Sequence, residues 1–298
     1  MIIVRLQGGL GNQMFQYAVG RALQKRRGDE LRLDVTYLLH PDIGRFDVPR
    51  EYSLDVFQIE PQFAYIPRLA ARVPKDQFAC PVGRVVREGV AIPRKIAYVR
   101  EEPFGFHPEI LSLNAPDVYL NGYWQSESYF AEIADDLRRE FLFRHRLSQR
   151  GRELAEEIAS VNAVCVNVRR GDLVSVESSR NALGFVGEEY YCRAEAWIKR
   201  HIPDARLYVS SDDFAWCREN LKFSLPVRYL DDCVGWKYGE LLQLMSLCRH
   251  FVIPNSTFAW WAAWLGSSEG KRVACPQTWF RNESISAKDL IPAAWERL

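Results

Sequence analysis

From residue 163 onward, short runs of apolar residues alternate with segments whose apolar residues recur at helical spacing. The apolar runs predict strands at 163–168, 207–210, 227–230, 251–253 and 272–275. The periodic segments predict helices near 188–200, 214–221 and 238–248, and a further helix from about 257. Almost wholly apolar strands that alternate with helices are typical of a parallel sheet covered on both faces. Such sheets bind ligands at the carboxyl ends of their strands.

The start of the chain shows the same alternation. Residues 2–6 and 31–35 predict strands, and apolar residues recur at helical spacing from Met14 until Gly28. Between about 42 and 116, prolines, aromatics and charges mix without a clear period, so we expect loops and short helices there. The chain therefore divides into two α/β domains, residues 1–145 and 146–298, and we expect its last helix to pack back on the first domain.

Composition and charge narrow the class of protein. Lys plus Arg number 39 and Asp plus Glu number 38, so the formal net charge is +1, and 48% of the 298 residues are hydrophobic. This balance excludes a disordered chain and gives no global attraction for nucleic acid. The length suits about two domains with a sizeable core.

The cysteines and the start of the chain bear on localisation. The seven cysteines are scattered, with no CxxC pair and no histidine at metal-ligand spacing, which indicates a reduced, cytoplasmic protein without structural zinc. No basic segment followed by an apolar run opens the chain, and the longest apolar stretch, 258–265, is too short to cross a bilayer. We therefore expect a protein that is neither secreted nor membrane-spanning.

One stretch departs from this even balance of charge. Residues 66–100 carry eight Lys and Arg but only Asp76 and Glu88 as acids. A solvated face balanced by acidic neighbours is one interpretation. The alternative is peripheral contact with anionic lipid or lipid-linked glycans at the inner face of the cell membrane.

A glycine-rich loop, residues 7–13, joins the first predicted strand to the first helix. Gly9 and Gly11 allow close backbone approach, and the helix N-terminus offers unpaired N–H groups, so the loop is a candidate anion or sugar cradle. It lacks both GxGxxG and the Lys-Ser/Thr of a P-loop, so those nucleotide motifs are excluded. The alternative is a tight turn with Asn12 as the helix N-cap.

Three further loops follow predicted strands of the second half. After the strand at 163–168, Arg169, Arg170 and Asp172 place two guanidinium groups and a carboxylate where a ligand would lie. Arginine suits phosphate oxygens, although an internal Arg–Asp ion pair is the alternative. A carboxylate paired in this way would have a lowered pKa and make a poor general base.

The other two loops carry hydroxyls and carboxylates. Asp212 suits the N1 and N2 donors of guanine, whereas Asp213 is equally well explained as a helix N-cap. Ser256 and Thr257 open a helix and could hold phosphate without a metal. The alternative is that the polar residues of this loop only cap the helix and that the aromatic residues after them form core. Core packing is favoured for the three tryptophans between 260 and 264.

The sequence argues against metal catalysis. Ser-Asp-Asp at 211–213 is not the Asp-x-Asp arrangement of metal-dependent nucleotide-sugar enzymes, and the five histidines are isolated. We therefore expect no metal site and no cofactor.

These motifs resemble the bacterial α-1,2-fucosyltransferases of glycosyltransferase family eleven. The resemblance rests on residues 8–17, on 121–127 with Tyr129 and Phe130, and on the three loops just described, in family order. It implies a two-domain GT-B fold with the nucleotide site in the C-terminal half. It also implies inverting transfer of L-fucose from GDP-fucose to the 2-hydroxyl of a galactose-terminated acceptor, with no metal.

The resemblance also assigns roles to residues. It implies that Arg169 and Arg170 contact or organise the diphosphate, that Asp212 reads guanine, and that Ser256 and Thr257 help to hold phosphate. Beyond the resemblance, we expect catalytic roles for Asp172 and for Asn12, which would face the donor sugar from the other domain. We also expect donor contacts from Gly9, Gly11, Asn167, Ser211 and Asn255, and acceptor contacts from Trp124, Gln125 and Glu127. The family pattern has histidine where this chain has Asn167, which puts in doubt any imidazole contact to the nucleotide.

Two other functions compete with this one. A fucosyltransferase of another linkage, such as α-1,6, uses a related arginine motif, but the segments 122–126 and 255–261 favour the α-1,2 group. A non-catalytic nucleotide-sugar or carbohydrate-binding protein is the more distant alternative. The intact arginine, aspartate and Asn-Ser-Thr loops argue against it.

Overall fold

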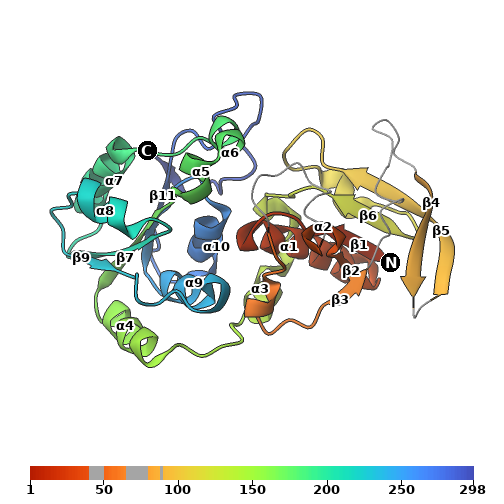
Figure 1. Ribbon diagram of the computed structural model, residues 1–298, viewed down its shortest axis with the longest axis horizontal. Coiled ribbons are helices and arrows are strands. Elements are labelled where there is room, and N and C mark those ends of the chain that lie inside the picture. The colour runs from red at the N-terminus through yellow and green to blue at the C-terminus, as the bar shows by residue number, and fades with distance from the viewer. Residues whose placement is uncertain (40–49, 65–79, 88–89) are drawn as a thin grey trace. The chain divides into compact units, whose positions relative to one another are not determined.

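The chain folds into two compact units, each built around a six-stranded sheet. The computed structural model describes residues 1–39, 50–64, 80–87 and 90–298. Unit 1 comprises Met1–Leu142 and Lys288–Leu290, and unit 2 comprises Phe143–Ala287 and Ile291–Leu298 (Figure 1). Both units combine sheet and helices, which confirms the α/β class.

The sheet of unit 1 has the strand order β3-β2-β1-β6-β5-β4. All its neighbouring strands pair parallel except the β4–β5 hairpin. Its strands are β1 (Ile2–Arg5), β2 (Leu31–Asp34), β3 (Gln62–Ala64), β4 (Cys80–Arg87), β5 (Val90–Arg100) and β6 (Val118–Asn121). Helix α1 (Leu10–Arg27) follows β1, ends at Gly28 in the left-handed conformation and buries most of its residues. The predicted first strand, helix and second strand are confirmed.

The expectation of loops and short helices between 42 and 116 is wrong, because β3, β4 and β5 lie there. Among the described residues, the first half of β5 pairs with β4 alone, and β5 pairs with β6 from Ala97 onward. A two-stranded ribbon of this kind tolerates prolines and charges that a central strand would not, and these hide the strand pattern. The basic stretch 66–100 falls largely here. Arg100 is its only basic residue whose side chain is described, so the expected lipid contact stays a prediction.

The sheet of unit 2 is wholly parallel, in the order β12-β11-β10-β7-β8-β9. Its strands are β7 (Asn162–Val168), β8 (Ala205–Ser211), β9 (Val227–Tyr229), β10 (His250–Val252), β11 (Val273–Cys275) and β12 (Glu296–Arg297). The predicted helices are α7 (Glu188–His201), α8 (Phe214–Asn220), α9 (Gly239–Ser246) and α10 (Thr257–Leu265). Every strand predicted in this half is confirmed to within two residues.

Several elements were not predicted. They are the helices α2 (Thr36–Leu39), α3 (Ala134–Glu140), α4 (Gln149–Ser160), α5 (Gly171–Ser175) and α6 (Glu177–Ala182). Short 3-10 turns lie at Leu54–Val56, Pro108–Ser112, Glu127–Tyr129, Ala131–Ile133 and Trp236–Tyr238. The predicted last helix is absent from the described residues, where strand β12 stands near the end of the chain, and the segment that groups with unit 1 is the turn Lys288–Leu290.

The order of strands in unit 2 positions its polar loops. Strand β7 lies between β10 and β8, and all three are parallel. The loops that follow them therefore leave the same edge of the sheet side by side. Beneath this edge, Trp260, Trp261 and Trp264 are at most 3% exposed and pack against one another, so the predicted aromatic core is confirmed.

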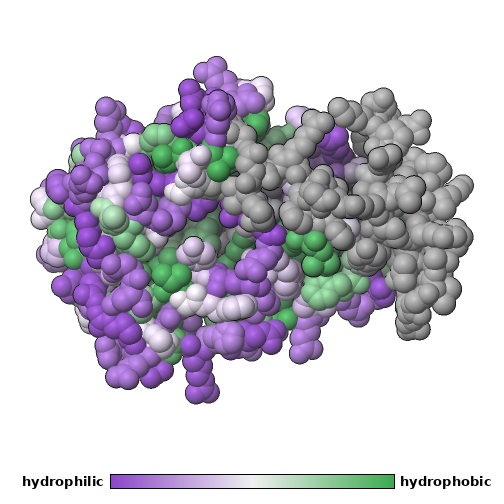
Figure 2. Space-filling view, in the orientation of Figure 1, coloured by the Kyte–Doolittle hydropathy of each residue, from purple (hydrophilic) through white to green (hydrophobic). Residues whose placement is uncertain are grey.

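The described surface shows no broad apolar face in the view of Figure 2, where hydrophobic residues form small separate patches among hydrophilic ones. Within the described residues, no helix is both long enough and apolar enough to cross a bilayer. Six cysteines, at positions 165, 192, 217, 233, 248 and 275, are free thiols.

Candidate functional site

The arginine loop follows β7 directly and is held by the loop after β8. Arg169 Nη1 donates to Asp212 Oδ2, and the backbone N–H of Arg170 donates to Asp212 Oδ1 at 2.8 Å. Both carboxylate oxygens of Asp212 are thus engaged within the protein. The expected internal ion pair exists, with Asp212 as the partner of Arg169. Asp172 lies in α5, and its side chain is outside the described residues.

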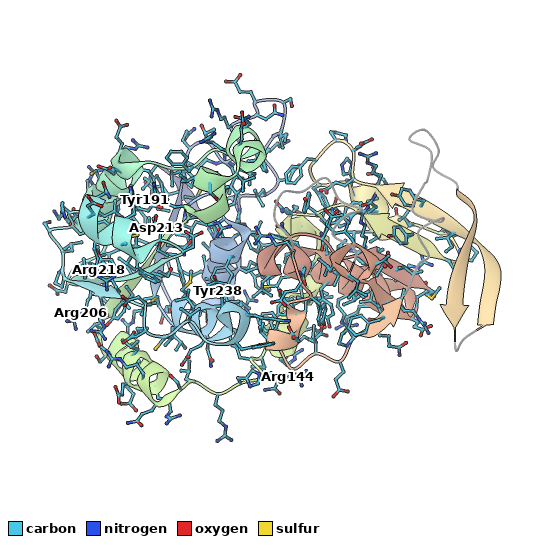
Figure 3. All side chains as sticks on the ribbon, in the orientation of Figure 1. Arg144, Tyr191, Arg206, Asp213, Arg218 and Tyr238 are labelled. Atoms are coloured by element: carbon cyan, nitrogen blue, oxygen red, sulfur yellow. The ribbon has the colours of Figure 1, made fainter. Side chains whose placement is uncertain are left out.

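Arg170 is held mainly by aromatic rings. Its guanidinium carbon lies 3.9 Å from the ring centroid of Trp216 and 5.8 Å from that of Phe185. Its Nε lies 3.4 Å from Asp213 Oδ2. Cation–π contacts of this kind fix a guanidinium without neutralising its charge. Asp213 also accepts from Trp216 N at 3.0 Å, so the predicted N-cap of α8 is confirmed (Figure 3).

Gly171 is required by the close packing of this loop. A Cβ atom at this position would lie 2.5 Å from Asp212 Oδ2 and 3.5 Å from Arg169 Nη1. Contacts under 3 Å force the neighbour to move. The glycine therefore leaves room for the ion pair between Arg169 and Asp212.

Two of the predicted donor residues on this edge have structural partners. Asn167 is 6% exposed, and its Nδ2 donates to Ser210 Oγ at 2.8 Å, so its amide cross-links β7 to β8. Ser211 Oγ accepts from Asp213 N at 2.9 Å. These contacts show that Asn167 and Ser211 shape the edge, and their direct contact to the donor stays a prediction.

The loop after β10 leads into α10. Ser256 is the N-cap of this helix, and its hydroxyl accepts from Ala259 N at 3.5 Å. Thr257 is the first residue of the helix. Capping by Ser256 is thus confirmed as one role, and the unpaired backbone N–H groups of the first turn remain suited to an anion.

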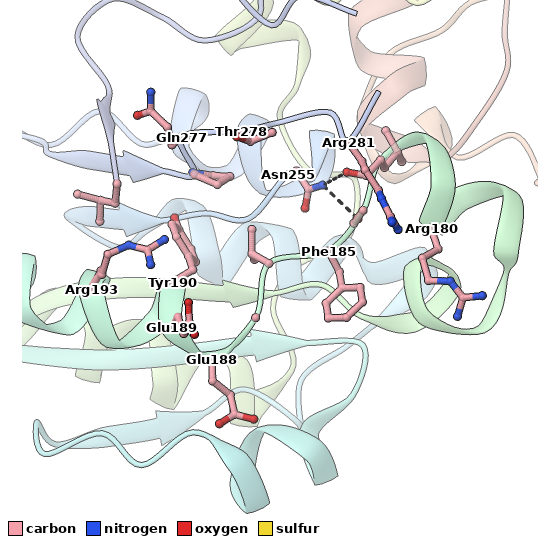
Figure 4. A pocket seen from close by; sticks show the side chains of 16 residues that line it. Arg180, Phe185, Glu188, Glu189, Tyr190, Arg193, Asn255, Gln277, Thr278 and Arg281 are labelled. Carbon is pink, nitrogen blue, oxygen red and sulfur yellow. Dashed lines mark hydrogen bonds between the residues drawn. The ribbon is translucent and has the colours of Figure 1, made fainter. Parts of the chain in front are cut away.

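Asn255 joins this loop to two others. Its Nδ2 donates to Leu183 O at 2.9 Å and to Trp279 O at 3.1 Å, whereas its buried Oδ1 has no hydrogen-bond partner in the described part of the chain. The residue lies in the wall of a pocket of about 720 Å³ beside the N-terminus of α7 (Figure 4). Phe185, which contacts Arg170, lines the same pocket.

In unit 1, the glycine loop is clamped by glutamines of α1. Gln13 Nε2 donates to Gly8 O and Glu51 O, and its Oε1 accepts from Ser53 N. Gly8 has φ +76°, and a Cβ there would lie 2.3 Å from Asn12 Nδ2, so both conformation and space require glycine. Gly9, by contrast, is extended with open space around it.

A second glutamine and Asn12 connect this loop to the loop after β6. Gln16 Oε1 accepts from Gln7 N at 3.0 Å, and its Nε2 donates to Gly122 O at 3.1 Å. Asn12 Oδ1 accepts from Gln125 Nε2 at 2.9 Å. The alternative that Asn12 caps α1 is wrong, because Gly9 is the N-cap. The structure thus joins Asn12, predicted as catalytic, to Gln125, predicted as acceptor-binding.

The other predicted acceptor residues differ in placement. Trp124 is 0% exposed and packs edge-on against Tyr129, so its ring is part of the core, and its acceptor contact stays a prediction. Glu127 begins the 3-10 turn Glu127–Tyr129, which Ser126 caps. Gly11 is buried in the first turn of α1.

No group of three or more His, Cys, Asp or Glu side chains is placed to hold a metal within the described part of the chain. The thiol of Cys217 is also unsuited to nucleophilic chemistry. Burial raises the pKa of Cys217, which lies under the arginine loop, to about 11, so this thiol stays protonated at neutral pH. Arginines and helix N–H groups are therefore the groups at this edge suited to negative charge.

Sequence reasoning missed several residues that shape the two edges. They are Gly8, Gln13 and Gln16 in unit 1, Phe185 and Trp216 in unit 2, and Glu101 after β5. The spacing of Gln13 and Gln16 by three residues on one helix face was an available signal, because polar residues on a buried face need partners. Glu101 gave no such signal, since the strand before it was itself not predicted.

Comparisons with known proteins agree with this geometry. A family model described as glycosyl transferase family 11 matches residues 109–297. The whole chain is 30% identical to an Escherichia coli alpha-1,2-colitosyltransferase, of which it covers 99%. It is 28% identical over 170 residues, 54% of this chain and 45% of the relative, to galactoside alpha-(1,2)-fucosyltransferase 1 of Rattus norvegicus. A mutant of Arabidopsis thaliana FUT1 in complex with GDP matches with a TM-score of 0.51 at 12% identity, over 91% of this chain and 69% of that one.

The two Rossmann-like units have the GT-B fold, and the family model identifies the chain as a glycosyltransferase. The family match covers more than half of the chain and the colitosyltransferase likeness covers all of it. The chain therefore belongs to glycosyl transferase family 11, as the resemblance implied, and its relatives by name form α-1,2 linkages.

Proposed function

We propose that this chain transfers L-fucose from GDP-fucose to the 2-hydroxyl of a terminal β-galactoside, with inversion at the anomeric carbon. The observation that carries the proposal is the meeting of the arginine loop after β7, the Asp212 loop after β8 and the N-terminus of α10 at one sheet edge. This edge can bind a diphosphate through guanidinium and backbone N–H groups.

In this reaction the acceptor oxygen forms a bond to C1 of the sugar while the bond from C1 to the phosphate oxygen breaks. GDP leaves with growing negative charge, and the hydroxyl proton passes to a base. Donors already in place at the developing charge supply the largest rate effect. We assign that role to Arg169 and Arg170, with Ser256 and Thr257 at the phosphates, and propose a catalytic role for Asp172, the carboxylate nearest to the two arginines in the sequence.

The remaining assignments concern the sugars. In this proposal Asn12 contacts the donor sugar, and Gln125 and Glu127 contact the acceptor. The hydrogen bond from Gln125 to Asn12 supports the proposal, because it places a donor-side residue beside an acceptor-side residue. Asp212 keeps its proposed contact to guanine, supported by its position after β8. The carboxylate of Asp212 would then accept hydrogen bonds from guanine in addition to those it accepts from the arginine loop.

The donor sugar has a second candidate. A relative that matches the whole chain is named for colitose, which is L-fucose without its 3-hydroxyl. Incubating the protein with GDP-fucose or GDP-colitose and a β-galactoside, followed by GDP assay and NMR of the product, tests both donors. An α-1,2 product supports the proposal, whereas an α-1,6 product would show that the proposed linkage is wrong. The absence of GDP release with both donors would favour a binding protein.

We also propose that the transfer needs no metal and no cofactor, because the arginines supply the positive charge. Activity is expected to persist in excess EDTA, with at most modest stimulation by divalent ions. The measurement is the initial rate of GDP release before and after chelation. Complete loss on chelation, reversed by manganese or magnesium, would contradict this proposal.

A further inference from the structure

Glu101 is the first residue after β5, at the carboxyl end of the sheet of unit 1. Strand β5 lies beside β6 there (Figure 1), and the loop after β6 carries Gln125. Glu101 Oε2 accepts from Tyr123 N at 2.6 Å and from Trp124 N at 3.1 Å. One carboxylate oxygen thus holds two successive backbone N–H groups of the neighbouring loop.

The loop that Glu101 holds has a strained backbone. Trp124 has φ +56°, a left-handed conformation that is a genuine outlier for a bulky residue. Such a conformation persists only where its surroundings impose it. At Gly122 a Cβ atom would lie 2.5 Å from Glu101 Cβ, so glycine is needed for the loop to approach the carboxylate.

The arrangement is not one that stability alone would favour. Trp124 Nε1 is buried and has no hydrogen-bond partner among the described residues, and such an atom costs stability. Burial also raises the pKa of the Glu101 carboxyl above its ordinary value. A strained, under-satisfied turn of this kind is typical of a segment kept for the position it gives to its neighbours.

The neighbour that this turn positions is Gln125. Its Nε2 donates to Asn12 Oδ1, and Gln16 holds Gly122 O on the other side of the turn. A continuous series of contacts therefore runs from Glu101 through the backbone of Trp124 to Gln125 and Asn12. A shift of about 1 Å in such a group can cost a hundredfold in rate.

We propose that Glu101 is a positioning residue for transfer, whose carboxylate holds the left-handed Tyr123–Trp124 turn so that Gln125 and Asn12 meet the sugars in register. This inference rests on the proposed function. It adds that the acceptor side of the site depends on a carboxylate that touches neither substrate. Donor nucleotide binding, which belongs to unit 2, is independent of it.

The test compares Glu101→Ala, Glu101→Gln and Glu101→Asp. Glu102→Ala is the matched control, since Glu102 is 61% exposed and pairs with Arg100 at 2.9 Å. We expect Glu101→Ala to lower kcat/KM for the acceptor by about tenfold or more, while the Kd for GDP by calorimetry stays within about twofold. Glu102→Ala is expected to match the wild type.

The other two variants separate geometry from charge. Gln keeps the reach to Tyr123 N and Trp124 N with an amide oxygen, whereas Asp keeps the charge but withdraws it by one methylene. Glu101→Gln is therefore expected to retain more activity than Glu101→Asp, and this order can be measured even if Glu101→Ala fails to fold. The opposite order would overturn the inference.

A double variant tests whether Glu101 acts through the loop. In a Gln125→Ala background, adding Glu101→Ala is expected to cost less than about threefold more, because contacting residues act together. Provided that the wild type is active, either of two results would overturn the inference. One is a loss in the double variant equal to the product of the two single losses, and the other is wild-type kinetics in a folded Glu101→Ala variant. A wild-type protein that transfers no sugar would instead refute the proposed function.

Discussion

Arg169 and Arg170 leave the same strand but are held by different forces. Arg169 pairs with Asp212 and its side chain is 29% exposed, whereas Arg170 contacts two aromatic rings and is 15% exposed. A guanidinium fixed before the substrate arrives needs no reorganisation when negative charge develops. Both guanidinium groups are therefore preorganised, Arg169 by its ion pair with Asp212 and Arg170 by its cation–π contacts.

Replacing either arginine should remove charge from the transition state. Arg169→Ala and Arg170→Ala are each expected to lower kcat by about a hundred- to a thousandfold, the usual loss for one preorganised donor. Single-turnover rates with GDP-fucose measure this effect. Near-wild-type rates in both variants would remove the arginines from the mechanism.

Gly171 offers a test of the ion pair that changes no charge. Gly171→Ala places a methyl group 2.5 Å from Asp212 Oδ2, and overpacking of this kind costs about 1–3 kcal/mol. The Kd for GDP should rise by about tenfold, as calorimetry would show. Gly187→Ala, where no atom lies within 4 Å of the added methyl, is the control. Equal affinity in both variants would mean that the ion pair does not shape the nucleotide site.

At the scale of elements, a buried histidine ties three strands of unit 2 together. His250 begins β10, its Nδ1 accepts from Arg272 N at 3.1 Å, and its Nε2 lies 3.1 Å from Asn162 Oδ1 at the start of β7. Burial, reinforced by Arg272 and Arg249, lowers the pKa of His250 below its ordinary value of 6.5. The neutral ring is therefore part of the strand pairing.

This shift makes the stability of unit 2 sensitive to acid. Because the unfolded histidine binds its proton more readily than the folded one, the free energy of unfolding falls as the pH drops below about 6.5. His250→Gln should be less stable than the wild type at neutral pH, but its Tm should fall by less than that of the wild type between pH 7 and pH 5. His201→Gln, at the end of α7, is the control. Parallel pH curves for wild type and His250→Gln would show that this histidine does not contribute.

The elements were easiest to predict where burial imposed a pattern. The central strand β7 is buried over its last six residues, and all of these except Asn167 are apolar, so the strand could be predicted. Strand β5 is partnered on one side along much of its length and was missed. The capping role of Asp213 could be predicted from its position just before a helix. The partner of Arg169 could not, because it depends on the register of β8 against β7, which local sequence does not specify.

At the scale of the whole molecule, the two units should respond differently to nucleotide. GDP at about a hundred times its Kd stabilises the unit that binds it by about 2.7 kcal/mol. Hydrogen exchange should slow at the strand ends of unit 2, around 169–172, 211–213 and 254–257, and not in the loops of unit 1. Equal protection in both units, or protection in unit 1 alone, would contradict the assignment of the nucleotide site.

The turn Lys288–Leu290 constrains how this chain can be recombined with its relatives. It belongs to unit 1 although the chain on both sides belongs to unit 2, and Asp289 Oδ2 accepts from Phe106 N at 3.1 Å, five residues after Glu101. A chimera that exchanged everything after residue 142 would replace a native support of the acceptor side along with the donor unit. Donor specificity should be exchanged cleanly only by swapping 143–287 and 291–298 while 288–290 stays with its own partner.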